Sequence, residues 1–563
     1  MTCGNDMTHI PGRRPLMTVM GVVCVGLLAF LLRMYHLGEQ ELWLDEVFSV
    51  HFAMLHQHFA DVLRLENSPP LYYLLLRSWI SIAGTGEAEV RFLSALAGTL
   101  GVLAVMWAGR QIFNSEVGLW TGGFAAVAPI HVYYSQEARV YALLTFELAL
   151  SYGLLWRAMR VNTRISWVLV AAAALSALYS HYFAVTALLP ALLIVAMWPS
   201  DAQTPLRRRR FLIATALCVM LYLPWLIWAF VLNSHADTIS NNYAMSYANW
   251  RALPSASVIP LTFELLGLGS QAELLPTNLK QFASLIFPDS MRIAGLALLL
   301  GLFLWVLAPW QDRNLAFPWL FRRKIWVTSL MVVPLMILWL ASLYRPIYVV
   351  GRHDIVAFPG YALLVGLAFA KLRAVKRIGV VLAILAGVGL VIPIGTKLLL
   401  YYRAPMVPAG NGIAATVDRY VGNDDIVVFD EVNGRLALGY YLPRLEYDWE
   451  SETCRNTRRH RHFICRIFPF EAEQTFLYAG ERVINSPELL LAEASAIARQ
   501  IEASNGRLWM SLHWSVFSDG ILVTVPPADF LVRELVRVGF QPQAVAMEGI
   551  APIFLFQRAV NVR

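Results

Sequence analysis

The stretch IGVVLAILAGVGLVIPIGTKLLL, residues 378–400, decides the fold class of this chain. It contains one charged side chain, Lys397, and it is long enough to cross a bilayer, which takes roughly 20 mostly apolar residues in a helix. The composition agrees, because 58% of the 563 residues are hydrophobic and only 15% are charged. A soluble protein of this size would be far more polar. We therefore expect an integral membrane protein.

Further apolar runs occur along most of the chain before residue 400, and together they predict about eleven transmembrane helices. The expected helices occupy residues 16–32, 92–109, 117–134, 141–156, 166–180, 183–198, 211–231, 291–309, 326–343, 355–370 and 378–400. The first run follows Arg13 and Arg14, as the apolar core of a signal peptide would. No small-x-small cleavage site follows in Arg33-Met34-Tyr35-His36-Leu37, so we expect a retained helix.

The basic residues predict how the chain is threaded through the membrane, because cytoplasmic loops are enriched in Lys and Arg. They collect on alternate connections, at Arg13, Arg14, Arg110, Arg157, Arg160, Arg164, Arg207 to Arg210, Arg322 to Lys324, Lys371, Arg373, Lys376 and Arg377. This pattern predicts a cytoplasmic N-terminus and an extracytoplasmic region from about Tyr401 onward. The net charge of +7 lies in these short clusters and not in one stripe, which argues against nucleic-acid binding. The expected location is a bacterial inner (plasma) membrane.

The loop between the first two spans, residues 33–91, is expected on the outer face with two interfacial helices. The first is indicated by helical spacing of the apolar residues Phe48, Phe52, Leu55, Phe59 and Val62 among polar neighbours. The second, from Leu71 to Trp79, begins after Pro69-Pro70 and is too short to cross the membrane.

The chain divides into a transmembrane domain, residues 1–400, and a more polar extracytoplasmic domain, residues 401–563. In the second domain we expect an α/β fold, with strands at Ile426–Phe429 and Leu508–Leu512 and a helix at 528–538 that ends before Gly539. Cys454 and Cys465 are expected to form a disulfide if this domain lies in an oxidising compartment.

Ionisable groups gather at the predicted outer face, where burial near the membrane makes them costly. These residues are Asp45, Glu46, Glu137, Arg139, His181, Arg345, Arg352, His353 and Asp354. Each also has a structural explanation: Asp45 could cap a helix, Glu137 and Arg139 could form an ion pair or contact headgroups, His181 could be a satisfied interfacial histidine and Arg352 could snorkel. Separate segments of the sequence place acids, arginines and a histidine on the same face. Their clustering favours a functional site over independent structural roles.

The order of several motifs resembles that of the GT-C membrane glycosyltransferases, in the branch related to protein O-mannosyltransferases and the aminoarabinose transferase of lipid A. The motifs are Trp43-Leu44-Asp45-Glu46-Val47-Phe48-Ser49, Asn67-Ser68-Pro69-Pro70-Leu71-Tyr72-Tyr73, Glu87 to Arg91, Ser135 to Tyr141, and Pro346 to His353. The resemblance covers most of residues 30–400. Two positions depart from the pattern: Ser68 replaces a usual His or Lys, and His353 replaces a usual Tyr.

The resemblance implies an inverting glycosyltransferase that moves a hexosyl or pentosyl group from a polyprenyl-phosphate sugar to a lipid, glycan or protein acceptor. Asp45 matches the acidic residue that in this family accepts the proton of the acceptor hydroxyl. Glu46 or Glu137 is expected to share this role or to orient the acceptor. The expected donor-phosphate ligands are Arg139, Arg352 and Arg345, since guanidinium groups bind phosphate well. The expected substrate-binding residues are Tyr141, His181, Ser68, Tyr72 and His353. No cofactor is certain; the carboxylates suit a divalent cation, but no close ligand spacing occurs.

Two other functions fit a polytopic chain. A transporter or lipid flippase would have broken helices and charges near the membrane midplane, whereas the acidic pair Asp45-Glu46 lies in a long outer loop. A non-catalytic scaffold could instead present the outer α/β domain.

The charge pattern of the loops makes the position of the C-terminus testable. A reporter that is active only in the cytoplasm, fused after Arg563, should stay silent because we expect that end outside. A strong signal from a full-length fusion would contradict the predicted threading.

Overall fold

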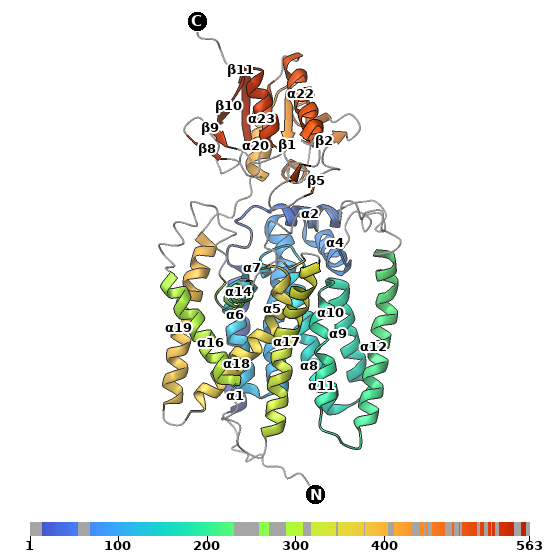
Figure 1. The fold of residues 1–563 in the computed structure, drawn as a ribbon, viewed down its shortest axis with the longest axis vertical. Helices are drawn as coiled ribbons and strands as arrows, with labels where there is room; N and C mark the ends of the chain where they lie inside the picture. Colours follow the sequence, from blue (N-terminus) through green and yellow to red (C-terminus); the bar gives the residue numbers. More distant parts are fainter. Residues whose placement is uncertain are drawn as a thin grey trace.

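The computed structural model describes residues 14–54, 68–229, 258–269, 289–307, 317–344, 347–348, 350–375, 378–403, 410–429, 438–442, 445–448, 453–467, 476–477, 483–484, 487–503, 507–511, 516–518, 521–523, 528–544 and 553–558. A bundle of long helices carries a domain with a β-sheet at one end (Figure 1). The described part of the first helix starts at the opposite end of the bundle.

The described helices follow each other along the first 403 residues. They are α1 (Arg14–Met34), α2 (Leu44–Met54), α4 (Leu71–Ala83), α5 (Glu87–Ile112), α6 (Ser115–Val127), α7 (Pro129–Ser135), α8 (Tyr141–Val161), α9 (Arg164–Ser180), α10 (Ala184–Leu188), α11 (Ala191–Met197), α12 (Thr204–Ile227), α14 (Val258–Leu268), α16 (Asp289–Leu307), α17 (Phe317–Tyr344), the 3₁₀ helix η4 (His353–Ala357), α18 (Phe358–Arg373) and α19 (Gly379–Arg403).

Each of the eleven predicted spans overlaps a helix, but two of them are broken. The segment 117–134 divides into α6 and α7 because Pro129 starts a new helix, and the segment 183–198 divides into α10 and α11 beside Pro190. Among the described residues, five helical segments are long and apolar enough to cross a membrane, namely Glu87–Ile112, Thr204–Ile227, Leu320–Leu343, His353–Arg373 and Gly379–Arg403. The count of eleven spans therefore stays a prediction.

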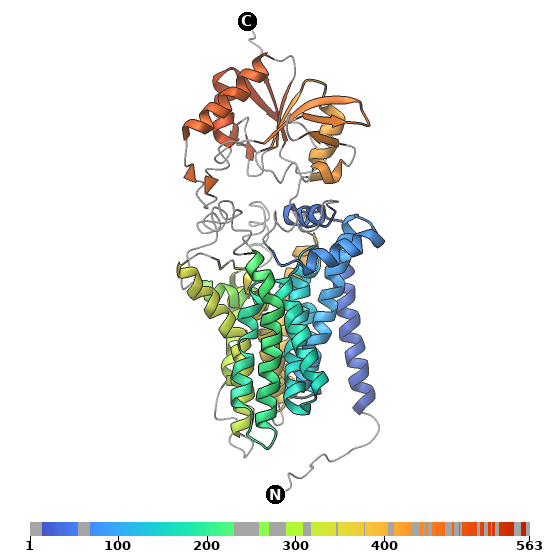
Figure 2. The same ribbon diagram turned by 90° about the vertical axis from the view of Figure 1, so that its right-hand side faces the viewer.

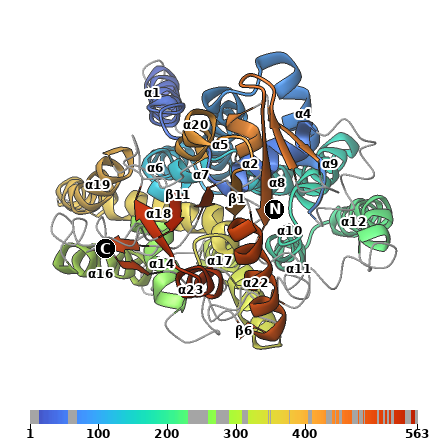
Figure 3. The ribbon, with the colours of Figure 1, turned by 90° about the horizontal axis from the view of Figure 1, so that it is seen from above.

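The bundle has a dense centre and an open rim. The apolar segment His353–Arg373, which contains α18, is mostly buried, whereas most residues of α19 are exposed or half-buried. Figure 3 shows α12 and α19 at the rim around α5, α8 and α18. Close packing at the centre depends on small residues, as is usual between membrane helices. A Cβ atom on Gly366 of α18 would lie 2.7 Å from the backbone nitrogen of Thr121 on α6, so only glycine fits there.

The C-terminal domain contains a mixed sheet in the order β10-β11-β7-β1-β4-β3-β2, in which β1 pairs in parallel with both β4 and β7. Its strands are β1 (Ile426–Phe429), β2 (Leu445–Asp448), β3 (Thr453–Asn456), β4 (Arg461–Ile467), β7 (Leu508–Ser511), β10 (Phe540–Ala544) and β11 (Ile553–Arg558), and two small hairpins join β5 (Phe476–Leu477) to β6 (Val483–Ile484) and β8 (Val516–Ser518) to β9 (Ile521–Val523).

Helices cover both faces of this sheet, as parallel strands require. Alternate residues of β1 enter two separate cores: Ile426 and Val428 pack with α22 (Pro487–Ala503) and α23 (Ala528–Arg537), whereas Val427 and Phe429 pack with α20 (Gly410–Tyr420). The strands predicted at 426 and 508 and the helix predicted at 528 are present. Gly539 follows α23 with a φ of 91°, a backbone conformation that favours glycine.

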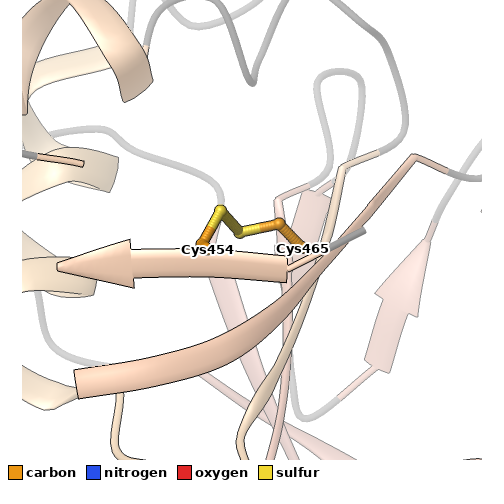
Figure 4. The surroundings of a disulfide bond; sticks show 2 residues. All are labelled: Cys454 and Cys465. Carbon is orange, nitrogen blue, oxygen red and sulfur yellow. A yellow bond between two sulfur atoms is a disulfide. The ribbon is translucent and has the colours of Figure 1, made fainter. Parts of the chain in front are cut away.

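The two cysteines of the C-terminal domain are joined. Cys454 on β3 and Cys465 on β4 form a disulfide between adjacent antiparallel strands, with their Cα atoms 5.7 Å apart (Figure 4). This confirms the predicted pairing.

Both helices that the sequence predicts in residues 33–91 exist among the described residues, as α2 and α4. They lie at the end of the bundle that faces the sheet domain (Figures 1 and 2). Leu55, Phe59 and Val62 of the predicted apolar stripe lie outside the described residues, and the interfacial position of the two helices stays a prediction.

A buried arginine organises the backbone before α2. Arg91 of α5 is 4% exposed and donates to the carbonyl oxygens of Leu37, Gln40 and Glu41 at 3.2, 2.6 and 2.8 Å. The same guanidinium donates to both carboxylate oxygens of Glu46, at 2.8 and 2.6 Å. One side chain therefore holds a non-helical segment and the following helix in a fixed relation.

The carboxylate of Glu46 also joins α2 to a third segment. It is fully buried and accepts hydrogen bonds from the backbone N–H groups of Trp43, at 3.1 Å, and Ala138, at 2.7 Å. The bond to Trp43 has the spacing of a capping box at the start of a helix. Glu46 thereby fixes where α2 begins and how it lies against residues 136–140.

Replacing Glu46 tests this arrangement. Glu46→Gln removes the counter-charge of the buried Arg91 guanidinium, and breaking one partner of a buried ion pair typically costs about 3–5 kcal/mol. We expect a clearly lower midpoint of thermal unfolding in purified protein. Glu39→Gln is the matched control, because Glu39 is exposed and, in the part of the chain that the structure describes, pairs with the partly exposed His36. Equal melting temperatures of the Glu46 variant and the wild type would contradict a stabilising role of the Arg91–Glu46 ion pair.

Candidate active site

Three charged residues from distant parts of the chain meet at the start of α2. The guanidinium of Arg352 donates to the carboxylate of Asp45, and Arg139 Nη2 lies 3.8 Å from Asp45 Oδ2. The side chains of Asp45, Arg139 and Arg352 are 20, 14 and 14% exposed, so the cluster is shielded but not fully buried. The structure thus brings together an acid and two arginines that the sequence placed on one face.

Neighbouring hydroxyl groups orient the two arginines. Arg352 Nε donates to the hydroxyl of Tyr141 at 2.6 Å, and Arg139 Nη1 donates to Ser49 Oγ at 3.1 Å. Burial lowers the pKa of Arg352 to about 10, which still leaves the guanidinium protonated at neutral pH. Both cations are therefore held in place around one carboxylate.

The backbone before Arg352 makes a tight turn. Gly351 has a φ of 81°, its N–H donates to a carboxylate oxygen of Asp354 at 3.0 Å, and its carbonyl oxygen accepts from the hydroxyl of Tyr134. The positive φ favours glycine at this position. The turn directs Arg352 from the start of η4 toward α2.

A cluster of three rings, those of His181, His353 and Phe183, lies beside Tyr141. The ring of His181 is 6.1 Å from that of Tyr141 and 6.0 Å from that of His353, and Phe183 packs on His353 at 4.6 Å between centroids. His181 Nδ1 accepts the N–H of Phe183 at 3.1 Å, which leaves the proton of the neutral ring on Nε2. Burial, and secondarily Arg139, lowers the pKa of His181 to about 4, so this ring is neutral at pH 7.

Tyr72 and Ser68 have different positions relative to this cluster. Tyr72 is 2% exposed, and its hydroxyl shares a hydrogen bond of 3.1 Å with Ser94, which in turn donates to the carbonyl of Arg139 at 3.2 Å. Tyr72 therefore supports the backbone behind Arg139. Ser68 is half-buried just before α4. Arg345, a predicted phosphate ligand, lies outside the described residues.

Glu137 lies on the Arg91 side of α2. It lines a small polar cavity of about 10 Å³, room for about one water, together with Glu46, Arg91, Tyr401 and other residues that do not include Asp45. No hydrogen bond of normal geometry reaches either of its carboxylate oxygens from a described residue. Burial raises the pKa of Glu137 to about 8, although Tyr133 and Arg139 act in the opposite direction. Glu137 is thus mainly protonated at pH 7.

Sequence reasoning assigned no role to Arg91 or Ser49. The signal for Arg91 was available, since it is a charged residue directly before the apolar run that begins at Phe92. Ser49 carries no such signal, because it contacts Arg139 only through the fold. Among the described residues, no group of three or more His, Cys, Asp or Glu side chains is placed to hold a metal ion.

Comparisons with known proteins place this geometry in context. Residues 67–228 match the family described as dolichyl-phosphate-mannose-protein mannosyltransferase. A search of curated proteins gives no match.

Solved structures resemble the chain over most of its length. ArnT from Cupriavidus metallidurans in the apo state is 15% identical with a TM-score of 0.56, covering 96% of this chain and 98% of that one. The same protein bound to undecaprenyl phosphate gives 13% identity, a TM-score of 0.54 and coverages of 97 and 98%.

The archaeal oligosaccharyltransferase AglB from Archaeoglobus fulgidus, solved with an inhibitory peptide and a dolichol-phosphate, is 11% identical with a TM-score of 0.50, covering 88% of this chain and 70% of that one. At such identities the likeness concerns the fold. The chain therefore has the fold of the GT-C glycosyltransferases, and its residues 67–228 match the dolichyl-phosphate-mannose-protein mannosyltransferase family.

Proposed function

We propose that this chain is an inverting glycosyltransferase that moves a sugar from a polyprenyl-phosphate donor to a lipid, glycan or protein acceptor. The observation that carries the proposal is the pairing of Asp45 with Arg352 and Arg139 at the start of α2. A carboxylate next to two oriented guanidinium groups suits a reaction that needs a base and releases a phosphate. The undecaprenyl phosphate of ArnT and the dolichol-phosphate of AglB support a lipid phosphate as the leaving group.

The phosphate of the donor would bind to the two arginines. Their guanidinium groups outnumber the single carboxylate between them, and Arg binds phosphate through paired, charge-assisted hydrogen bonds. In the structure Arg352 is bonded to Asp45. A phosphate that takes over this guanidinium would release the carboxylate for chemistry.

Asp45 would then act as the general base. The acceptor hydroxyl attacks the anomeric carbon, its proton passes to Asp45, and the bond from the anomeric carbon to the phosphate oxygen breaks. The negative charge that develops on the phosphate is stabilised by Arg139 and Arg352. A single displacement of this kind inverts the configuration of the sugar.

Glu46 and Glu137 would support this reaction without contacting the substrate, from the side of α2 that faces Arg91. Glu46 is fully buried and saturated by Arg91 and two backbone N–H groups, so it positions α2. The protonated Glu137 faces the cavity on the same side. Tyr141, His181 and His353 form an aromatic wall beside Arg352, suited to contact the sugar or carrier.

The membrane arrangement that we propose follows the sequence: about eleven spans, interfacial α2 and α4, a cytoplasmic N-terminus and an extracytoplasmic C-terminal domain in a bacterial inner membrane. The loops rich in Lys and Arg support this orientation. A sugar of hexosyl or pentosyl type would then be transferred on the outer face.

A transporter or lipid flippase is the alternative, and the breaks between α6 and α7 and between α10 and α11 are features that such a protein would share. The charged cluster, however, lies at the end of the bundle beside α2. Sugar release from a polyprenyl-phosphate sugar in detergent separates the two functions, because only the transferase consumes the donor.

The role of Asp45 is tested by Asp45→Asn. The change keeps the size of the side chain but removes the base, and the loss of a general base typically lowers the rate about a hundredfold to ten-thousandfold. We expect that loss in the turnover of purified enzyme, with donor binding retained. Near-normal turnover in monodisperse protein would show that Asp45 has only a structural role, as the ion-pair partner of Arg352.

The role of Arg352 is tested by Arg352→Ala. A hydrogen bond to a charged group contributes roughly 1.5–3 kcal/mol, so we expect donor affinity to fall about tenfold to a hundredfold. Binding of the labelled lipid phosphate measures this directly. Arg373→Ala is the control, because Arg373 forms an exposed pair with Glu116 elsewhere in the fold. Unchanged donor affinity together with unchanged turnover in the Arg352 variant would remove Arg352 from the site.

A further inference from the structure

The C-terminal domain touches the transmembrane domain through two adjacent tyrosines. The hydroxyl of Tyr441 accepts the backbone N–H of Leu42 at 2.6 Å, and the hydroxyl of Tyr440 donates to the carbonyl of Thr85. Their rings pack edge to face with centroids 4.8 Å apart. Both hydroxyls therefore reach the outer loop from a short segment, residues 438–442, of the sheet domain that lies above it (Figure 1).

The bond from Leu42 to Tyr441 completes the support of one particular stretch of backbone. Leu42 is 1% exposed, so its N–H needs an acceptor inside the protein. The carbonyl groups that precede it are held by Arg91, and the N–H that follows it, of Trp43, is held by Glu46. Tyr441 thus adds a hydrogen bond from the sheet domain to residues 40–43, whose other hydrogen bonds described above come from Arg91 and Glu46 in the helical bundle.

This segment leads directly to the reacting group. Leu42 precedes Asp45 by three residues, and α2 begins at Leu44. A shift of the backbone at Leu42 would move the start of α2, and with it the carboxylate that faces Arg352 and Arg139. Misplacement of a catalytic group by about 1 Å can lower a rate by about a hundredfold.

We propose that Tyr441 is a positioning residue for the transfer reaction: it fixes Leu42 from outside the membrane and so holds Asp45 at the depth of the donor phosphate. This inference rests on the proposed function of Asp45. It makes the sheet domain part of the catalytic unit, where its fold alone would suggest a separate appendage.

Neighbouring Tyr440 provides a matched control. Both tyrosines are half-buried and both lie in the same segment, but Tyr440 bonds to Thr85, before α5, and not to the backbone that leads to Asp45. Removing either hydroxyl should weaken the docking of the sheet domain by a similar amount. Only removal of the Tyr441 hydroxyl should disturb Leu42.

The experiment compares Tyr441→Phe and Tyr440→Phe in the full-length protein, reconstituted in lipid nanodiscs. We expect Tyr441→Phe to lower kcat about tenfold, the size of effect that follows from the loss of roughly one hydrogen bond, with the donor KM within about twofold of wild type. Hydrogen–deuterium exchange in the peptide containing Leu42 should become faster. Tyr440→Phe should leave kcat, KM and this exchange close to wild type.

Normal kcat in Tyr441→Phe, or equal losses in both variants, would overturn the proposal, because the second result would indicate domain docking alone. If the wild-type protein releases no sugar from any polyprenyl-phosphate sugar, the proposed function fails. The exchange measurement then still decides the structural claim, and unchanged exchange at Leu42 in Tyr441→Phe would refute it.

Discussion

Buried backbone outside a helix must find its hydrogen bonds inside the protein, and the fold described here depends on how Arg91 meets that constraint. The guanidinium presents its donors in a fixed fork, so one side chain bonds three carbonyl groups and the carboxylate of Glu46 together. A lysine could not reproduce this geometry. The start of α2, and so the place of Asp45, follows from this one buried residue.

The geometry of α2 separates the environments of two neighbouring acids, Asp45 and Glu46. Successive residues of an α-helix point about 100° apart, so Asp45 and Glu46 cannot face the same partners. Glu46 points into the bundle, where it is fully buried against Arg91, while Asp45 faces Arg352 and Arg139 and keeps some exposure. Glu46 is thereby enclosed by structural partners, whereas Asp45 stays partly exposed beside two guanidinium groups.

Local patterns in the sequence predicted much of this fold, but not the pairings that act over long distances. Hydropathy located a helix at every predicted span, and the apolar strand at 426 was correctly placed. Hydropathy could not show that Pro129 and Pro190 break two spans, since the residues around them stay apolar. The charge pattern predicted that Asp45, Arg139 and Arg352 lie on one face. It could not predict that Glu46 is buried while Asp45 stays partly exposed, because that difference depends on where Arg91 lies in the fold. Arg33, considered from the sequence only for the question of cleavage, is fully buried and donates to Ser135 on α7; no local pattern contains that contact.

The bond between Leu42 and Tyr441 also has a consequence for how the molecule is made. Its two partners are 399 residues apart, so a ribosome completes the segment around Leu42 long before it supplies the tyrosine. Tyr441 belongs to the sheet domain, which also contains the Cys454–Cys465 bridge. Until Tyr441 has been made and the sheet domain has docked, the N–H of Leu42 therefore lacks this acceptor. The segment before α2 thus gains this hydrogen bond only when a part of the chain made much later has folded and docked against it.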